Sequence, residues 1–310
     1  MSPYSRVGSH VMARIRFDRL PTERQNPQSR SLDRLAPTAI ARLMNRADGN
    51  ALRAVGRAAP TIGRVVTALV ERLERGGRLI FVGAGTSGRL GVIEAAECPP
   101  TFNTSPRQVQ AVMAGGRRAV FRSVEGSEDD ERAGAAATRR RVRRGDVVVG
   151  IAASGVTRFV RAALAEARRR GALSVLVTCN PGVPRGAAAM VIALRVGPEV
   201  LAGSTRLKAG TATKLALNTL TTAAFTRLGK VHGNRMVDLQ PKSAKLRARA
   251  ERLVAELGRV GSPRARRLLR EARGSAKVAI VMARRGESAQ LARRRLVSAR
   301  GFLGRALESR

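Results

Sequence analysis

The segment GAGTSGRLG, from Gly83 to Gly91, combines residue types that could bind a phosphate group. It follows an apolar run, and its glycines would let a ligand approach the backbone closely. Thr86 and Ser87 add hydroxyl groups, and the helix expected after them would direct its N-terminal amides at a bound anion. The loop lacks both the acidic residue of a dinucleotide-binding fingerprint and the Gly-Lys-Ser/Thr of a Walker loop. We therefore predict a phosphate cradle that includes Gly85, Thr86 and Ser87.

A second turn rich in hydroxyl groups, AASGVT, spans residues 152–157 and could serve the same ligand. It also follows an apolar run, and it offers Ser154, Gly155 and Thr157. Two such turns at neighbouring strand ends can close around one phosphate, so the pair is more specific than either turn alone. The alternative is that these serines and threonines are ordinary helix caps.

The chain has only 22 acidic residues against 59 lysines and arginines, yet six of the acidic residues fall in two short segments. Two carboxylates that face one ligand can divide acid and base work when their surroundings separate their pKa values. Glu97 directly precedes Cys98-Pro99-Pro100, where a helix should stop, so we expect its side chain at a helix end. The alternative is that these carboxylates only balance nearby arginines. The candidates are Glu94, Glu97, Glu125, Glu128, Asp129 and Asp130.

The segment GSTRLKAGTATKLALNTL, residues 203–220, is unusually polar for the beginning of a helix. Lys208 could reach a phosphate or a sugar, and Lys214 and Asn218 share one face at i,i+4 spacing. The alternative is a capped helix whose leucines pack in the core, and both interpretations can hold together.

The sequence predicts neither a metal site nor a cysteine nucleophile. No cluster of histidines and cysteines has metal-ligand spacing. Neither His10 nor His232 lies in a recognisable triad context for Cys98, so we expect this thiol to be buried as a small apolar group. Cys179, at the end of an apolar run, is interpreted in the same way.

Five short apolar runs alternate with segments that can form helices, such as residues 157–170. This pattern predicts an α/β fold, in which a five-stranded parallel sheet is sandwiched by helices. Ligands of such sheets bind beyond the carboxyl ends of the strands, where both hydroxyl-rich turns are expected. The strands are predicted within residues 78–85, 109–116, 146–155, 173–182 and 190–197.

Helices should precede and follow the sheet. Apolar residues at helical spacing occur in 40–44 and 62–73, and a long helix is expected around 204–228. The C-terminal tail should be a small helical bundle, with Ser262-Pro263 and Ser288 at helix starts. We divide the chain into a basic arm at 1–20 that we expect to be disordered, an α/β domain at 21–242 that carries the phosphate cradle and a C-terminal helical subdomain at 243–310.

The formal net charge of +37 rests mainly on 53 arginines, against 6 lysines. No aromatic residues interleave with the arginine clusters, as a stacking platform for nucleic acid would need. The arginine-rich composition is typical of a GC-rich genome, so we expect no dedicated nucleic-acid partner. No apolar run reaches the length of a membrane span, and the N-terminus lacks the apolar centre of a secretory signal. With two cysteines and no disulfide framework, we expect a cytoplasmic protein.

Six segments together resemble the N-acetylmuramic acid 6-phosphate etherases, a family built on the sugar isomerase (SIS) fold. The resemblance covers most of the chain, and the combination GTSGRLG…ECPPT is highly specific. It implies a lyase that cleaves the D-lactyl ether of N-acetylmuramic acid 6-phosphate, in the recycling of cell-wall sugar. It also implies a homodimer and no metal or redox cofactor. The segments are VGAGTSGRLGVIEAAECPPTF, VEGSEDD, VVVGIAASG, CNPG, AGSTRLKAGTATKLALNTL and LGKVHGNRMVDLQPKSAKL.

The family pattern places acid/base chemistry on two glutamates, Glu97 of ECPPT and Glu128 of EGSEDD. We take Glu97 as the proton donor to lactate and Glu128 as its acid/base partner, and the division of roles stays open. By the same resemblance, Ser87, Ser154 and Thr157 would bind the phosphate or the sugar.

Two alternatives stay open beside the lyase. A non-catalytic, sugar-phosphate-sensing regulator on the same fold would need only the phosphate loops, although both glutamates favour an enzyme. Aldose–ketose isomerisation also begins with proton abstraction at C2, and only the resemblance separates it from elimination. In addition, Val156 stands where the family usually has arginine, which removes a cation near the site and bears on substrate affinity.

Overall fold

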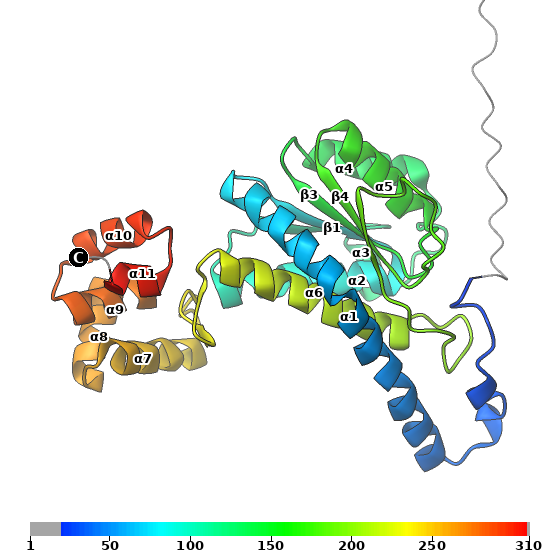
Figure 1. Ribbon diagram of the computed structural model, residues 1–310, viewed down its shortest axis with the longest axis horizontal. Coiled ribbons are helices and arrows are strands. Elements are labelled where there is room, and N and C mark those ends of the chain that lie inside the picture. The colour runs from blue at the N-terminus through cyan, green and yellow to red at the C-terminus, as the bar shows by residue number, and fades with distance from the viewer. Residues whose placement is uncertain (1–19, 309–310) are drawn as a thin grey trace, which may run out of the picture.

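The computed structural model describes residues 20–308, and its centre is a five-stranded parallel sheet (Figure 1). The strand order is β2-β1-β3-β4-β5, so β2 lies on one side of β1 and the later strands lie on the other. The loops after β1 and β3 therefore diverge and leave a crevice at the carboxyl edge. Each strand lies within a predicted apolar run, which confirms the predicted sheet. The strands are β1 (Leu79–Gly83), β2 (Val109–Met113), β3 (Val147–Ile151), β4 (Leu173–Thr178) and β5 (Met190–Ala193).

Helices cover both faces of this sheet and create two apolar cores. Side chains alternate between the faces of a strand, so Phe81 lies with α1, α2 and α6, whereas Ile80 lies with α4 and α5. Strands buried on both faces are rich in valine and isoleucine, as in β3. The covering helices are α1 (Pro37–Glu74), α2 (Gly85–Phe102), α4 (Glu131–Arg141), α5 (Arg158–Arg169) and α6 (Lys208–Arg227), with the short α3 (Arg118–Phe121) between β2 and α4.

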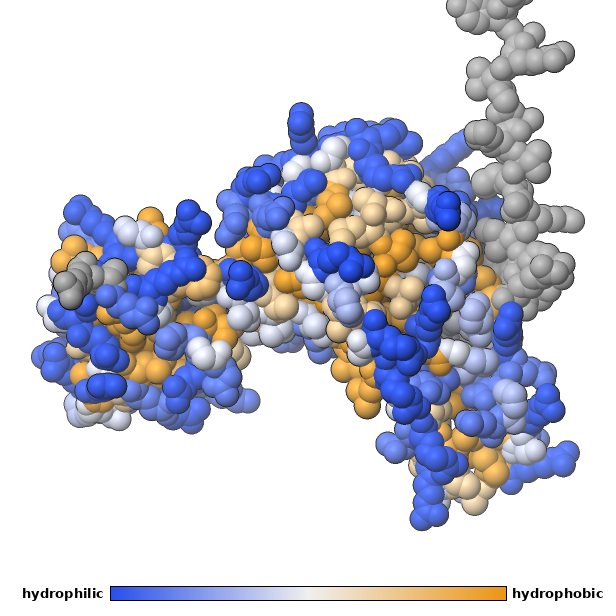
Figure 2. Space-filling model, in the orientation of Figure 1, coloured by the Kyte–Doolittle hydropathy of each residue, from blue (hydrophilic) through white to orange (hydrophobic). Residues whose placement is uncertain are grey.

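Both apolar stripes that we predicted near the N-terminus lie on one helix, the 38-residue α1. Its later turns bury Ile62 and Leu69 against the sheet core. Its first turns extend away from the sheet, where Leu43 packs with Val200, and hydrophilic side chains line the outer face (Figures 1 and 2). Two short 3-10 helices, at Pro27–Ser29 and Leu32–Arg34, precede α1.

The C-terminal helices form a lobe beyond the end of α6, at the left of Figure 1. They have a core cluster of their own. Buried Lys277 ties this lobe to the end of α6, because its Nζ donates to Gly229 O at 3.0 Å and lies 3.2 Å from Asp238. The lobe follows a hairpin of β6 (Val231–His232) and β7 (Arg235–Met236), and its helices are α7 (Ala244–Gly258), α8 (Ser262–Glu271), α9 (Ala276–Arg285), α10 (Ala289–Ser298) and α11 (Leu303–Glu308).

The end of α2 differs from the prediction. The helix continues through Pro99 and Pro100, so Glu97 is not at a helix end. The φ of proline suits a helix, and the prolines fall in the last turn, where only two carbonyl acceptors lose their N–H donors. Asn103 ends the helix in the left-handed region, with φ 53°, and its N–H donates to Pro99 O at 3.0 Å.

Two other helix starts test the capping predictions. Ser288 caps α10, because its Oγ accepts the Leu291 N–H at 3.3 Å, as predicted. Ser262 is inside α8, and Gly261 is the N-cap, so the predicted serine cap was wrong.

The predicted basic arm lies outside the described residues except for Leu20. Residues 20–308 contain no helix that is both long and apolar enough to cross a bilayer.

Candidate active site

A cavity of about 1260 Å³ opens at the carboxyl edge of the sheet. The loops that follow β1, β2, β3 and β4 all contribute to its lining, which is the position expected for a ligand of a doubly wound sheet. Both hydroxyl-rich turns therefore border one space. The predicted site residues that line it are Gly85, Thr86, Ser87, Ser154, Thr157 and Glu128, whereas Gly155, Glu97 and Lys208 do not.

The first turn is the N-terminus of α2. Gly85 has a φ of 54°, in the left-handed region that favours glycine, and no side chain caps the helix before it. Thr86 and Ser87 occupy the first helical turn and are partly buried. The amides of that turn and the two hydroxyl groups are thus available to an anion in the cavity. Gly88 lets α2 approach the sheet, since a Cβ there would lie 2.4 Å from Met113 Sδ.

The second turn, residues 152–157, packs against the loop that follows β4. Gly155 is buried with a φ of 74°, and a Cβ there would lie 2.3 Å from Val183 Cγ1. Asn180, which follows β4 and lines the cavity, donates its side-chain N–H to Ser154 O at 3.0 Å. Thr157 is the N-cap residue of α5 but makes no side-chain capping bond. The sequence identified the CNPG motif without assigning Asn180 to the site.

The acidic loop at 123–130 places Glu128 beside the second turn. The Phe159 N–H, two residues after Thr157, donates to Glu128 O at 2.9 Å. Ser127 Oγ donates to Val124 O at 2.7 Å and tightens the loop. The Glu128 side chain is exposed and borders the cavity, as do Glu125 and Asp129. A carboxylate therefore lies close to the proposed phosphate turn.

Three arginines that the sequence did not assign to the site also line the cavity. Arg89 is committed to the wall, because its Nε donates to Val120 O at 2.8 Å. Arg158 lies 4.0 Å from Glu131, at the limit of an ion pair. Arg161 is one turn further along α5. The i,i+3 spacing of Arg158 and Arg161 places both on one face of a helix directly after the second turn, and this pattern could have identified them from the sequence. The positive charges of Arg158 and Arg161 can balance the charge of an anion bound in this cavity.

Glu97 lies outside this cavity. It is exposed, and it is twelve residues after Gly85 in α2, about 18 Å along the helix axis. Glu94, one helical turn before Glu97 in α2, is buried against α6. Its carboxylate accepts hydrogen bonds from Lys214 at 3.1 Å and from Thr221 at 2.5 Å. Within one chain, the structure therefore does not bring Glu97 to the cavity that Glu128 borders.

Both cysteine thiols are buried, as predicted from the sequence. Burial raises the pKa of Cys98 to about 12, and the nearby Glu94 and Glu97 carboxylates act in the same direction. Burial also raises the pKa of Cys179 to about 12. Such thiols stay protonated, which does not suit a nucleophile. In the described part of the chain, no three His, Cys, Asp or Glu side chains are placed to hold a metal ion.

Lys208 does not fit the predicted substrate contact. Its side chain is only 2% exposed, and its Nζ donates to Val196 O at 3.2 Å and to Pro198 O at 2.5 Å. Glu199, fully buried, accepts the Lys208 backbone N–H at 3.0 Å. Burial lowers the pKa of the Lys208 ammonium group. Lys208 thus fastens the start of α6 to the loop after β5, because that loop offers carbonyl acceptors which the sequence does not reveal.

The sheet order and the two hydroxyl-rich turns around one cavity define a domain of the SIS class. Two family models agree: the SIS domain matches residues 124–223, and the glucokinase regulatory protein N-terminal SIS domain matches residues 61–168. Among solved structures, the chain is similar to a phosphoheptose isomerase from Francisella tularensis, with 16% identity, a TM-score of 0.47 and coverage of 62% of this chain and 99% of that one.

More similar relatives define the family within this class. The N-acetylmuramic acid 6-phosphate etherase of Symbiobacterium thermophilum is 51% identical over 86% of this chain and 89% of its own length. The etherase of Geobacillus thermodenitrificans is 45% identical over 94% of this chain and its own full length. The chain belongs to the N-acetylmuramic acid 6-phosphate etherase family, which confirms the resemblance seen in the sequence.

Proposed function

We propose that this protein is a lyase that cleaves the D-lactyl ether of N-acetylmuramic acid 6-phosphate. The products are N-acetylglucosamine 6-phosphate and D-lactate, and the reaction serves the recycling of cell-wall sugar. The observation that carries the proposal is the close relationship to etherases along most of the chain. The cavity adds support, because it joins two hydroxyl-rich turns to the carboxylate of Glu128.

The chemistry avoids direct hydrolysis of an ether, in which an alkoxide would be a poor leaving group. Opening of the sugar ring exposes an aldehyde, which acidifies the hydrogen on C2. A carboxylate removes that proton, the C3–O bond breaks, and a carboxylic acid protonates the departing lactate. Water then adds to C3 of the unsaturated aldehyde, and a proton returns to C2. Two glutamates suffice as general acid and base, without a covalent enzyme intermediate.

The sugar phosphate is placed by the turns at the carboxyl edge. Its phosphate lies against the N-terminus of α2, where Thr86 and Ser87 offer hydroxyl groups, and against Ser154 and Thr157 of the second turn. This arrangement directs the sugar toward Glu128, which we assign as one acid/base residue. Gly155 contributes through the shape of the turn.

Glu97 is supplied by a second subunit. In one chain it lies outside the cavity, on the exposed side of α2, so a site with both glutamates needs another copy. A two-fold homodimer, in which each α2 borders the partner's cavity, supplies Glu97 to both sites. Glu97 then protonates lactate, and Glu128 is its acid/base partner.

We also assign the enzyme to the cytoplasm, in agreement with two buried free thiols and a charged sugar-phosphate substrate. We assign the catalytic unit to residues 21–242 and the C-terminal helical subdomain to residues 243–310, of which 309 and 310 lie outside the described residues.

The function is tested by D-lactate release from N-acetylmuramic acid 6-phosphate. We expect release by the wild type and a large loss in Glu97→Ala and in Glu128→Ala. A folded wild type that binds the sugar phosphate but releases no D-lactate would leave only the sensing regulator.

The dimeric site is tested by mixing the two inactive variants. If Glu97 acts across the interface, each mixed dimer regains one complete site, and an equal mixture recovers about a quarter of the wild-type activity. If both glutamates act within one chain, every site lacks one of them and the mixture stays inactive. Exchange of subunits is confirmed by a tag on one variant.

A further inference from the structure

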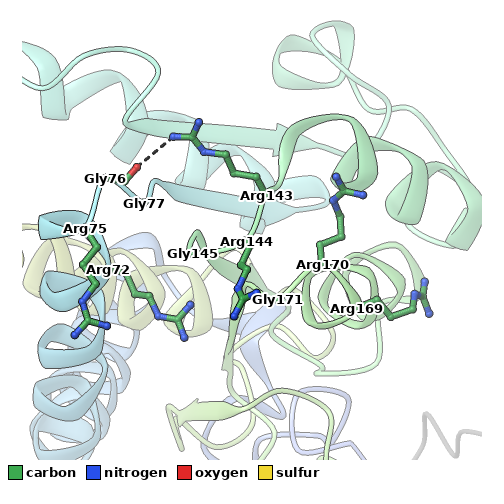
Figure 3. Close-up of a pocket in the computed structure, with 10 residues that line it drawn as sticks. All are labelled: Arg72, Arg75, Gly76, Gly77, Arg143, Arg144, Gly145, Arg169, Arg170 and Gly171. Carbon is green, nitrogen blue, oxygen red and sulfur yellow. Dashed lines mark hydrogen bonds between the residues drawn. The ribbon is translucent and has the colours of Figure 1, made fainter.

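A second cavity, of about 1030 Å³, lies at the amino edge of the sheet, opposite the candidate active site. Three loops converge there, each with arginine next to glycine, and they enter the neighbouring strands β1, β3 and β4. Within residues 20–308, every residue that lines it is arginine or glycine: Arg72, Arg75, Gly76, Gly77, Arg143, Arg144, Gly145, Arg169, Arg170 and Gly171 (Figure 3).

The glycines let the loops come close enough to share one cavity. A Cβ on Gly77 would lie 2.4 Å from Gly145 O, so only glycine permits this approach. Gly145 itself has a φ of 91°, and Gly171 has a φ of 73°, in the left-handed region. Three arginine-bearing loops are thereby held together on a rigid sheet edge.

Three of the six guanidinium groups lack a partner within the described residues. Among residues 20–308, the side chains of Arg72, Arg75 and Arg144 form no hydrogen bond or ion pair. All three extend to the same side of the loops in Figure 3, whereas Arg143 turns toward Gly76 O, to which it donates at 3.2 Å. In the same view, Arg170 extends to the other side.

Local negative charge balances only part of this cluster. Buried Asp146 pairs with Arg78 at 2.6 Å and lies 3.9 Å from Arg143. Buried Glu166 pairs with Arg169 at 2.5 Å, so these carboxylates offset two of the lining arginines at most. The C-termini of α1, α4 and α5 end near this edge and together add roughly one and a half negative charges. No carboxylate in the described part of the chain lines the cavity, so a net positive charge remains within it.

We propose that this arginine cavity binds a small polyanion that carries two or more linked phosphate groups. Guanidinium groups recognise phosphate oxygens by bidentate, charge-assisted hydrogen bonds, and bound phosphate would relieve the repulsion among the arginines. The described residues bring no aromatic or aliphatic side chain into the cavity that could hold a nucleobase. It therefore selects the phosphate chain itself, whether that chain is inorganic or belongs to a nucleotide.

The test is calorimetric titration of inorganic tripolyphosphate into the full-length protein, at about 0.15 M salt to screen long-range attraction. The test variant changes Arg72, Arg75 and Arg144 to glutamine. The control variant removes the same charge from the C-terminal lobe, where Arg264, Arg270 and Arg294 are exposed and have no side-chain partner within residues 20–308.

We expect tripolyphosphate to bind the wild type, with a loss of affinity at the arginine cavity of about tenfold or more in the test variant and little change in the control. ATP should bind as tightly as tripolyphosphate. D-lactate release should be equal in both variants, which verifies that each is folded. An equal loss of affinity in both variants would show that tripolyphosphate binds through nonspecific electrostatic attraction, and it would overturn the proposal. Absence of tripolyphosphate binding would also overturn the proposal, and so would binding of ATP without binding of tripolyphosphate. A third contrary result would be tighter binding of single-stranded DNA that both variants weaken equally.

Discussion

The Lys214 ammonium group lies 3.1 Å from the Glu94 carboxylate and joins α6 to α2 one turn before Glu97. Glu94 is only 5% exposed and also accepts the Thr221 hydroxyl group. Glu94→Ala would leave a buried hydroxyl and an ammonium group without this partner. We expect the free energy of unfolding, measured in urea, to fall by about 1–3 kcal/mol. Glu97→Ala is the exposed control and should change stability by less than about 0.5 kcal/mol. Equal stability of both variants would contradict this role for Glu94.

Gly155 should be needed for substrate binding although it does not line the cavity. Gly155→Ala places a Cβ against Val183 in a backbone conformation that alanine rarely adopts, so the second turn must shift. We expect KM for the sugar phosphate to rise about tenfold or more, because the hydroxyl groups of Ser154 and Thr157 move away from the phosphate. Gly186→Ala, also at positive φ but with open space around its Cβ, is the matched control. An unchanged KM in Gly155→Ala would remove this turn from the phosphate site.

Introducing a cation at position 156 should strengthen substrate binding. Val156 lines the cavity, and an arginine there could make a charge-assisted hydrogen bond to the phosphate. We expect Val156→Arg to lower KM about tenfold, with kcat nearly unchanged. Val156→Gln has a similar reach without the charge and should change KM little. If KM stays the same in Val156→Arg, the phosphate does not lie beside this turn.

Acid should remove the stabilisation that Glu166 provides. The Arg169 guanidinium, which donates to this carboxylate, lowers the pKa of Glu166 from its ordinary value of 4.5. The unfolded chain thus binds this proton more readily, so the stabilisation is complete above pH 4.5 and is lost as the pH falls through the lower folded pKa. We expect the Tm difference between wild type and Glu166→Gln to shrink in that acid range. A difference that is independent of pH would show that the carboxylate does not act through its charge.

The two thiols should be inert in the folded protein. Burial holds the pKa of Cys98 and of Cys179 near 12, so iodoacetamide at mildly alkaline pH should label neither until the chain is unfolded. Cys98→Ala should keep its D-lactate release. Rapid labelling of Cys98 in native protein, together with loss of activity, would return this thiol to the list of nucleophile candidates.

The sequence could predict the strands and the two phosphate turns because their signals are local. Each strand is a short apolar run, and each turn follows its strand directly, so parallel strand ends bring Ser87 and Ser154 to one edge. Spacing could not predict the position of Glu97, which depends on the direction of α2 away from the crevice. Nor could it predict the burial of Lys208, whose carbonyl partners belong to the loop after β5.

The course of bond breaking is the most direct test of the account, because elimination followed by water addition differs from hydrolysis in where oxygen enters. The wild type is given N-acetylmuramic acid 6-phosphate in water enriched in heavy oxygen, and both products are analysed by mass spectrometry. Elimination followed by water addition places the heavy oxygen on C3 of N-acetylglucosamine 6-phosphate and none in the hydroxyl group of D-lactate. Heavy oxygen in the D-lactate hydroxyl group would mean that water attacks the lactyl carbon, and it would contradict the elimination.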